Sequence, residues 1–221
     1  MKNNDSNRLD IELPKGLVVF ISGVPGVGKT TISYELLRMF DEFRIVEETD
    51  LIREALRGYS EYIKDSFEDK ELCFLDEIEI AHNKKFLRYG EAKKQCEHMK
   101  KSFEKIVRRQ KRKGISTIIN GVHIVPEVLD GFCEIDHVLF FNLSLNNKSS
   151  LCDRWTQRDS KKYNTKNLSI AFQTNIELSL STRRLSKISK NIFFDIDVTN
   201  LSIAQTKAQI VKAFSNLLQN P

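Results

Sequence analysis

The eight residues from Gly23 to Thr30 constrain this 221-residue chain more than any other segment. Their sequence, Gly-Val-Pro-Gly-Val-Gly-Lys-Thr, follows an apolar run at residues 17–21 and precedes residues 31–40, where apolar side chains recur at helical spacing. The apolar run is typical of a buried strand, and the later spacing is typical of an amphipathic helix. The segment is therefore predicted to be a glycine-rich turn that joins a strand to a helix.

This segment matches the phosphate-loop pattern G-x-x-x-x-G-K-[ST] at every position. Its glycines would let successive backbone N–H groups converge on phosphate oxygens at the positive N-terminus of the helix. Lys29 would reach the β- and γ-phosphates, and the Thr30 hydroxyl would ligate Mg²⁺. The expected nucleotide-binding residues are Gly23, Val24, Pro25, Gly26, Val27, Gly28, Lys29, Thr30 and Thr31. The alternative is a glycine-rich turn whose lysine only faces solvent.

Length and composition suit one enzyme domain. The chain can build one sizeable core, and a formal net charge of +5 with a pI near 8.9 suits an anionic substrate without requiring a nucleic acid. The four cysteines are far apart and form no C-x-x-C pair, which favours reduced thiols. Residues 1–14 lack a signal-peptide pattern, and no apolar run reaches the length of a membrane span. We therefore expect a cytoplasmic enzyme with no membrane partner.

Strand and helix patterns alternate along the chain. The strand patterns lie at residues 17–21, 44–48, 115–120, 137–143 and 192–196. With helical patterns between them, they predict an α/β fold: a five-stranded parallel sheet with helices on both faces. Residues 1–13 are expected to form a flexible tail and residues 14–221 a single domain. A helix starting at Leu51 is expected to stop near Gly58.

The second strand is followed by Asp50 and Arg53. Open α/β sheets bind ligands at the carboxyl ends of their strands, so both side chains are candidates for an acceptor site. A carboxylate there can orient or deprotonate an attacking hydroxyl, and an arginine one turn later can hold an anionic group. Asp50 could equally cap the following helix, but its position beside a phosphate loop favours a functional role.

A helix predicted near residues 91–113 ends in the basic run Arg108–Lys113. Such a run could contact nucleic acid. A solvated helix end is the favoured interpretation, because cations near a C-terminus offset the helix dipole and Gly114 supplies the stop.

The segments Thr49–Glu54 and Gly121–Pro126, together with the phosphate loop, resemble the 2-phosphoglycerate kinase family of phosphate-loop kinases, and residues 66–68 add a shorter match. The resemblance implies a P-loop NTPase fold of the nucleoside-kinase-like type. It also implies a helical substrate-binding insertion at about 59–113 and an arginine-bearing lid at about 149–168. The implied reaction transfers the γ-phosphoryl group from ATP, with Mg²⁺, to a hydroxyl of a small anionic metabolite.

The resemblance also assigns roles to individual residues. The catalytic candidates are Lys29, Asp50, Arg53, Arg154 and Arg158, and the substrate-binding candidates are Asp50, Arg53, Gly121 and His123. Arg154 and Arg158 are one helical turn apart, so both could face the equatorial phosphoryl oxygens; the alternative is a solvent-facing basic helix. His123 could contact the acceptor or phosphate, or bond loop carbonyls. Asn120 stands where the family usually has glutamate, and an amide can neither act as a base nor supply charge to Mg²⁺.

Two other functions stay open. One is a kinase acting on a nucleic-acid end or a nucleotide-sugar, as polynucleotide kinases and zeta-like toxins do. The other is an ATP-dependent switch or binding module, which usually needs a carboxylate for Mg²⁺ and water after the third strand. Asp76–Glu77 ends an apolar run, but that run is short and lies between charged helical segments, so it is not interpreted as that carboxylate site.

Overall fold

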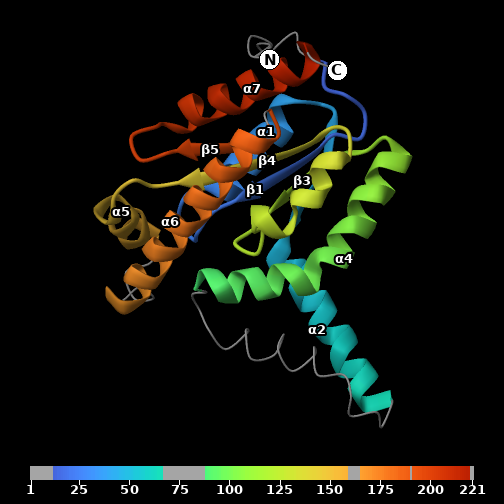
Figure 1. Cartoon of the computed structure of the whole chain (residues 1–221), viewed down its shortest axis with the longest axis horizontal. Coiled ribbons are helices and arrows are strands. Elements are labelled where there is room, and N and C mark those ends of the chain that lie inside the picture. The colour runs from blue at the N-terminus through green and yellow to red at the C-terminus, as the bar shows by residue number, and fades with distance from the viewer. Residues whose placement is uncertain (1–11, 67–87, 159–164, 190, 220–221) are drawn as a thin grey trace, which may run out of the picture.

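The structure is a computed structural model that describes residues 12–66, 88–158, 165–189 and 191–219, arranged around one parallel sheet (Figure 1). The elements are β1 (Val18–Ser22), α1 (Lys29–Met39), β2 (Phe43–Glu48), α2 (Thr49–Ser66), α4 (Tyr89–Lys113), β3 (Ser116–Asn120), the 3₁₀ turns η1 (Pro126–Val128) and η2 (Asp130–Glu134), β4 (Val138–Ser144), α5 (Lys148–Arg158), α6 (Thr165–Ile188), β5 (Phe193–Asp197) and α7 (Ile203–Gln219). All five predicted strands are present, each within one residue of its predicted bounds. The predicted five-stranded α/β fold is confirmed.

The strands are parallel and lie in the order β2-β3-β1-β4-β5. The central strand β1 is buried along its whole length, as expected for a parallel strand with helices over both faces. From β1 the chain passes to β2 on one side, returns to β3, and then crosses β1 to reach β4. Open α/β sheets bind ligands where the strand order reverses in this way. The carboxyl ends of β1 and β3 are therefore the expected place for a site.

Stacked phenylalanines fill the side of the sheet that α4 and α6 cover. Phe20 of β1 stacks on Phe140 of β4 with ring centroids 4.7 Å apart, and Phe140 stacks on Phe193 of β5 at 4.8 Å. The edge of Phe103, from α4, approaches Phe20 at 6.0 Å. These rings come from positions in register on neighbouring strands, so one aromatic layer ties three strands to a covering helix.

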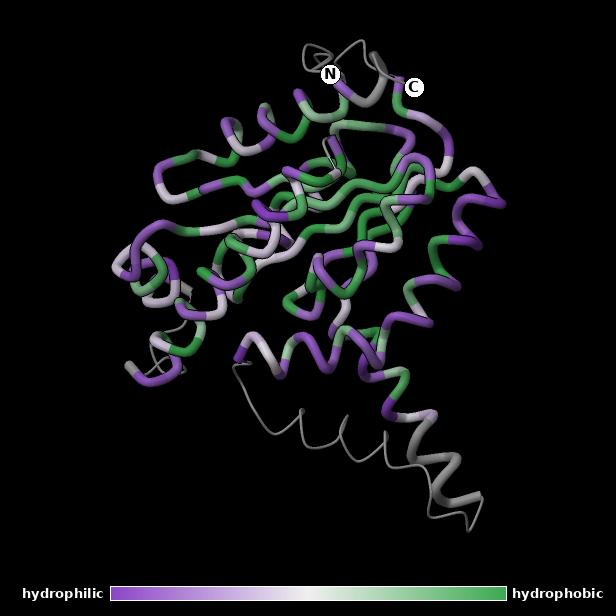
Figure 2. Tube along the Cα trace, in the orientation of Figure 1, coloured by the Kyte–Doolittle hydropathy of each residue, from purple (hydrophilic) through white to green (hydrophobic). Residues whose placement is uncertain are grey.

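Helices α1 and α7 cover the opposite face. Phe141 of β4 and Phe40, which follows α1, both contact the ring of Phe214 in α7. Figure 2 shows the strands as the most continuously hydrophobic part of the trace, with helices of alternating character around them. The core is therefore a sheet buried on both sides, which gives its carboxyl edge a rigid base.

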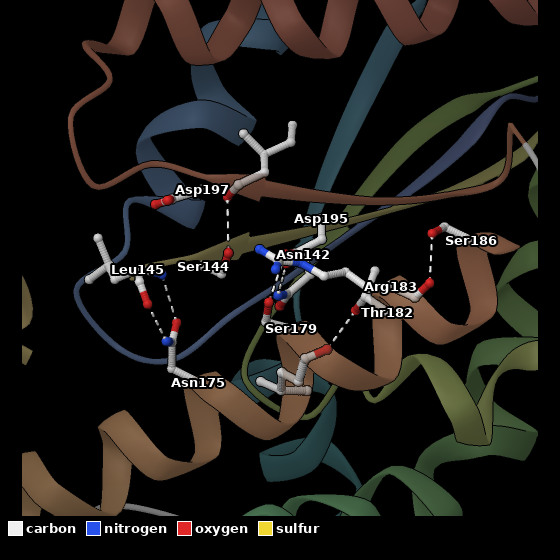
Figure 3. A network of polar contacts seen from close by, with 12 residues as sticks. Asn142, Ser144, Leu145, Asn175, Ser179, Thr182, Arg183, Ser186, Asp195 and Asp197 are labelled. Atoms are coloured by element: carbon white, nitrogen blue, oxygen red, sulfur yellow. Dashed lines mark hydrogen bonds and ion pairs between the residues drawn. The ribbon is translucent and has the colours of Figure 1, made fainter. Parts of the chain in front are cut away.

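Buried polar contacts fix α6 to β4 and β5 (Figure 3). The carboxylate of Asp195 accepts hydrogen bonds from Asn142 Nδ2, Ser179 Oγ and Arg183 Nε, each at 2.7 Å. The Asp195 side chain is only 2% exposed and Asn142 is buried, and this carboxylate is paired with donors from a neighbouring strand and from α6. Such pairing is what a buried charge requires.

A second contact fixes α6 at the end of β4. The amide of Asn175 accepts a hydrogen bond from the Leu145 N–H at 3.0 Å and donates to the Leu145 carbonyl at 2.7 Å. The Asn175 side chain thus pairs with both the N–H and the C=O of Leu145, the residue that follows β4. These are the two backbone groups that a neighbouring strand would otherwise pair.

The predicted helix stop near Gly58 is wrong. Helix α2 starts at Thr49 and continues through Gly58 to Ser66. A glycine inside a helix costs only about 1 kcal/mol relative to alanine, so it does not end an otherwise favourable helix. Asp50 is in the first turn of α2, so its alternative interpretation as the capping residue before Leu51 is also wrong.

The predicted stop of α4 is confirmed. Gly114 has φ 63° and its N–H bonds the carbonyls of Gln110 and Lys111, while three cations occupy the last turn. The predicted tail at 1–13 and the predicted insertion at 59–113 lie partly outside the described residues. Cys73 lies wholly outside them. Cys96, Cys133 and Cys152 are free thiols. Among the described helices, none has the length and hydrophobicity needed to cross a membrane.

Candidate active site

The loop after β1 has the backbone of an anion-binding turn. Gly23, Gly26 and Gly28 have φ angles of 139°, 91° and 103°, a region that side-chain-bearing residues rarely adopt. Gly28 immediately precedes α1 and supplies no side-chain cap, so the first N–H groups of that helix keep their donors available. An anion is the partner that such a helix N-terminus favours.

Helix α5 holds the outer side of this loop. Trp155 Nε1 donates to the Pro25 carbonyl at 2.8 Å, and Arg154 NH1 donates to the Val27 carbonyl at 3.1 Å. Arg154 NH2 reaches the Val198 carbonyl after β5 at 2.5 Å. Two adjacent residues of α5 therefore hold the phosphate loop, and one of them also connects it to the segment that follows the edge strand β5.

These tethers orient the N–H groups of the loop. The C=O and N–H of a trans peptide point in opposite directions, so carbonyls held by α5 turn the N–H groups of Gly26 and Gly28 away from it. Lys29 Nζ holds a third carbonyl, that of Val24, at 3.0 Å, but the next residue, Pro25, has no N–H for this contact to orient. Donors directed to one side form the kind of nest that cradles a phosphate.

Sequence patterns did not predict a role for Trp155. Its ring is buried, and a Cβ built on Gly26 would lie 2.6 Å from the ring atom Cδ1, so the loop glycine is needed for this contact as well as for its φ. The available signal was that this is the only tryptophan in the chain and that it adjoins Arg154. Burial of Arg154 lowers its pKa, but an arginine stays charged at any physiological pH.

A cleft of about 530 Å³ opens beside the loop. Its lining residues are Pro25, Gly26, Gly28, Lys29, Thr30, Thr31, Glu48, Asp50, Asn120, Gly121, Val122 and Arg154. The cleft thus brings most of the predicted nucleotide-binding residues together with Asp50, Gly121 and Arg154. Glu48 was missed, although it ends the second strand only two residues before Asp50.

Asp50 lines the cleft, and Arg53 lies beside it in the first turns of α2. The Asp50 side chain is 67% exposed and lies 3.5 Å from Arg53 NH2. Arg53 also donates to Glu54 at 3.0 Å, and Arg53 and Arg57 together lower the pKa of that carboxyl against the opposing effect of desolvation. Arg53 does not line the cleft itself, but it contacts Asp50, which does.

His123 is buried below Arg53 and does not line the cleft. Its Nε2 lies 3.2 Å from Arg53 NH1, and its Nδ1 lies 2.9 Å from Thr49 Oγ1. Burial lowers the pKa of His123 to about 4, with the Asp50 carboxylate opposing the shift and Arg53 and Lys29 adding to it. The ring is therefore neutral near pH 7. Because a guanidinium can only donate, Nε2 accepts from Arg53, and the proton on Nδ1 donates to Thr49.

Gly121 has a packing reason to be glycine. A Cβ at this position would lie 1.6 Å from Thr49 Oγ1, the atom that also contacts His123. Residues 121–123 and Thr49 thus form one closely packed support behind Arg53.

The remaining predicted residues are placed less completely. Arg158 is the last residue of α5, but its side chain lies outside the described part of the structure, as do residues 159–164 of the proposed lid. Residues 67 and 68 of the short family match and the acidic pair Asp76–Glu77 also lie outside the described residues.

Comparisons with known proteins agree with the motifs. The chain is 31% identical to a 2-phosphoglycerate kinase from Thermococcus kodakarensis over 157 residues, which cover 66% of this chain and 51% of the relative. A 2-phosphoglycerate kinase from Methanothermobacter thermautotrophicus is 26% identical over 168 residues, with the same two coverages. The chain thus spans about half the length of these curated relatives. No protein-family model matches it.

Among solved structures, a gluconokinase from Sinorhizobium meliloti superimposes with a TM-score of 0.55 at 15% identity, covering 95% of this chain and 97% of that one. At this identity the likeness concerns the fold alone. The chain therefore has the P-loop kinase fold, and the resemblance of its motifs to 2-phosphoglycerate kinases is confirmed over about two thirds of its length.

Proposed function

We propose that this chain is a kinase that transfers the γ-phosphoryl group of ATP, with Mg²⁺, to a hydroxyl of a small anionic metabolite. The observation that carries the proposal is the cleft of about 530 Å³, because one wall is the phosphate loop and the other carries Asp50. A donor phosphate and an acceptor hydroxyl can therefore meet in one space.

The donor half would be residues 23–31. The N–H groups of Gly26 and Gly28 and the first turn of α1 would bind phosphate oxygens. Lys29 now donates to the Val24 carbonyl, and it would move to the β- and γ-phosphate oxygens when a nucleotide enters. Positive charge there stabilises the transition state, because phosphoryl transfer depends on positioning and electrostatics more than on covalent catalysis.

The acceptor half would be Asp50 with Arg53 beside it. Asp50 would accept a hydrogen bond from the acceptor hydroxyl and take its proton as the hydroxyl oxygen attacks the γ-phosphorus. The new P–O bond replaces the bond to the β,γ-bridging oxygen, so ADP leaves with that electron pair. Arg53, held by neutral His123, would attract an anionic group of the acceptor.

The oxygen donors lining the cleft fit a magnesium ion. Thr30 offers a hydroxyl, and Glu48 and Asp50 offer carboxylates on the same cleft. Mg²⁺ prefers oxygen ligands and is usually held by one or two protein groups together with substrate phosphates. When bound, the ion would neutralise charge on the nucleotide phosphates.

The names of the relatives support a choice of acceptor. Both reported relatives are named 2-phosphoglycerate kinases, so 2-phosphoglycerate is the first acceptor to test. A nucleic-acid end is not favoured. The basic turn at residues 111–113 lies just before β3 begins, whereas the cleft lies at the carboxyl ends of the strands.

Mass spectrometry of reactions with ATP, Mg²⁺ and 2-phosphoglycerate, followed by a panel of hydroxy acids, tests the proposal. The expected product is an acceptor heavier by one phosphate, formed together with ADP. Lys29→Ala should lower turnover at least a hundredfold, because one preorganised charge at a transition state contributes about that much. Lys105→Ala, an exposed cation on α4, is the matched control and should leave turnover unchanged.

Near-native phosphorylation by the Lys29→Ala protein would refute the assignment. ADP release with no phosphorylated acceptor in any reaction would instead identify an ATP-dependent switch.

A further inference from the structure

Asn120 carries a buried donor with no hydrogen-bond partner. It is the last residue of β3, is 3% exposed, and its Nδ2 atom contacts no acceptor in the described part of the structure. Leaving such a donor unsatisfied costs roughly 1–3 kcal/mol, so an otherwise well-packed protein has few of them. Of the unpartnered buried side-chain atoms among the described residues, this is the one whose residue lines the cleft.

The strand order defines where in the cleft this donor lies. At the carboxyl edge the phosphate loop follows β1, Asn120 ends the neighbouring β3, and Glu48 ends β2 beyond it. Asn120 is in register with Ile21 of β1 on one side and with Glu48 on the other. The amide therefore lies between the nucleotide loop and the carboxylates of the acceptor side.

We propose that Asn120 is a catalytic residue whose Nδ2 donates a hydrogen bond to an oxygen of the transferring γ-phosphoryl group. This inference rests on the proposed function. The position between donor and acceptor is the one that the transferring group must occupy, and phosphoryl oxygens are acceptors that would satisfy the amide. A neutral donor also adds no carboxylate charge to repel the phosphate beside Glu48 and Asp50.

The contact distinguishes nucleotides by their terminal phosphate. ATP presents a γ-phosphoryl oxygen to Nδ2, whereas ADP does not reach it. The free protein keeps an unsatisfied donor, so removing that donor should not weaken the fold. If Asn120 only supported the strand, its replacement would lower the stability of the protein. It would also weaken the affinity for both nucleotides to the same extent.

Calorimetric titration of the whole chain with ADP and with the β,γ-imido analogue of ATP, both with Mg²⁺, tests this contact. In Asn120→Ala we expect the dissociation constant for the imido analogue to rise about tenfold, as for loss of one hydrogen bond to a charged group. The constant for ADP should change less than twofold, and the melting temperature should stay the same or rise. Asn120→Leu, which fills a similar volume without a donor, should give the same selectivity and separates the donor from any cavity.

Gln95→Ala is the matched control. Gln95 is a buried amide of α4 that also lacks partners in the described structure, but it does not line the cleft. Its replacement should leave the affinity for both nucleotides unchanged. Equal weakening of both nucleotides in the Asn120 variants, or no weakening of either, would overturn the role of Asn120 while leaving the proposed kinase intact. Failure of the unmodified chain to bind either nucleotide would overturn both.

Discussion

The contacts of His123 show how a single residue can support a site without lining it. Its neutral ring has one acceptor and one donor, and Arg53 and Thr49 use both. Protonation would put a second donor opposite the Arg53 guanidinium, so two donors would face each other in a buried space. Burial is the main cause of the lowered pKa of His123, and the charge of Arg53 adds to it, so the folded structure requires that His123 stay neutral.

This requirement predicts a pH-dependent stability. An unfolded histidine has a pKa near 6.5, and that of folded His123 is about 4, so between these values the unfolded state binds a proton that the native state excludes. The free energy of unfolding should therefore fall as the pH is lowered through this window, by about 1 kcal/mol per pH unit. Urea denaturation at pH 7 and pH 5 measures the change.

His123→Gln, whose amide oxygen can still accept from Arg53, should lose this component of the pH dependence. Burial and Lys111 also lower the pKa of His137, but His137 is present in both proteins, so the difference between them isolates His123. Identical slopes in the two proteins would show that His123 is not responsible.

Among the helices, α5 contacts two segments that are far apart in the sequence, the phosphate loop and the residues after β5. The family resemblance implies an arginine-bearing lid at about 149–168. In the structure, residues 154 and 155 bond three backbone carbonyls, two of them in the phosphate loop. Residues 154 and 155 of α5 are thus packed against the phosphate loop.

The tether predicts a specific effect of Trp155→Phe. This variant keeps an aromatic ring against Gly26 but loses the Nε1 donor to Pro25. The loop should be less well ordered, and the affinity for ATP should fall about fivefold, corresponding to one neutral hydrogen bond of roughly 1 kcal/mol. Calorimetric titration with ATP measures it.

Thr156→Val is the control for this helix. The Thr156 hydroxyl donates to the Cys152 carbonyl within α5, and the residue is exposed. Its replacement should leave ATP affinity unchanged. If Trp155→Phe bound ATP as tightly as the unmodified chain, the tether would have no role in shaping the loop.

In the whole molecule, the candidate site and the buried polar network lie on different sides of β1. The cleft lies over β1, β3 and β2, while the buried polar network around Asp195 joins β4, β5 and α6 (Figure 3). Loss of a network partner should therefore affect folding more than binding.

Asp195→Ala should lower the free energy of unfolding by about 3 kcal/mol, because it leaves Asn142 and Ser179 with buried unpaired donors. Nucleotide affinity should stay within about twofold under conditions where the protein is folded. Arg183→Ala removes a partner that is 60% exposed and should cost less than about 1 kcal/mol. Chemical denaturation compares the three proteins, and equal losses for the two variants would contradict a buried network.

The fold could be predicted further than the site. Apolar runs indicated all five strands, because a strand buried on both faces has a continuous hydrophobic sequence. The glycine at position 58 was a poor guide to the length of α2, since one glycine costs a helix only about 1 kcal/mol. Nor could periodicity find Trp155 beside Pro25 or His123 below Arg53, because these contacts join positions 130 and 70 residues apart. Motifs located the phosphate loop, but its supports depend on tertiary structure.

The long separation between the phosphate loop and its tethers has a consequence for the order of assembly. A chain synthesised from its N-terminus makes the whole motif at residues 23–30 well before Arg154 and Trp155 exist, since these partners follow by 127 and 130 positions. A nascent chain ending after β4 would carry every residue of the motif and strands β1 to β4, yet no donor from α5 to turn the loop carbonyls outward. Nucleotide binding would then be acquired late in synthesis, so the affinity of the growing chain for ATP would report that its C-terminal third has docked.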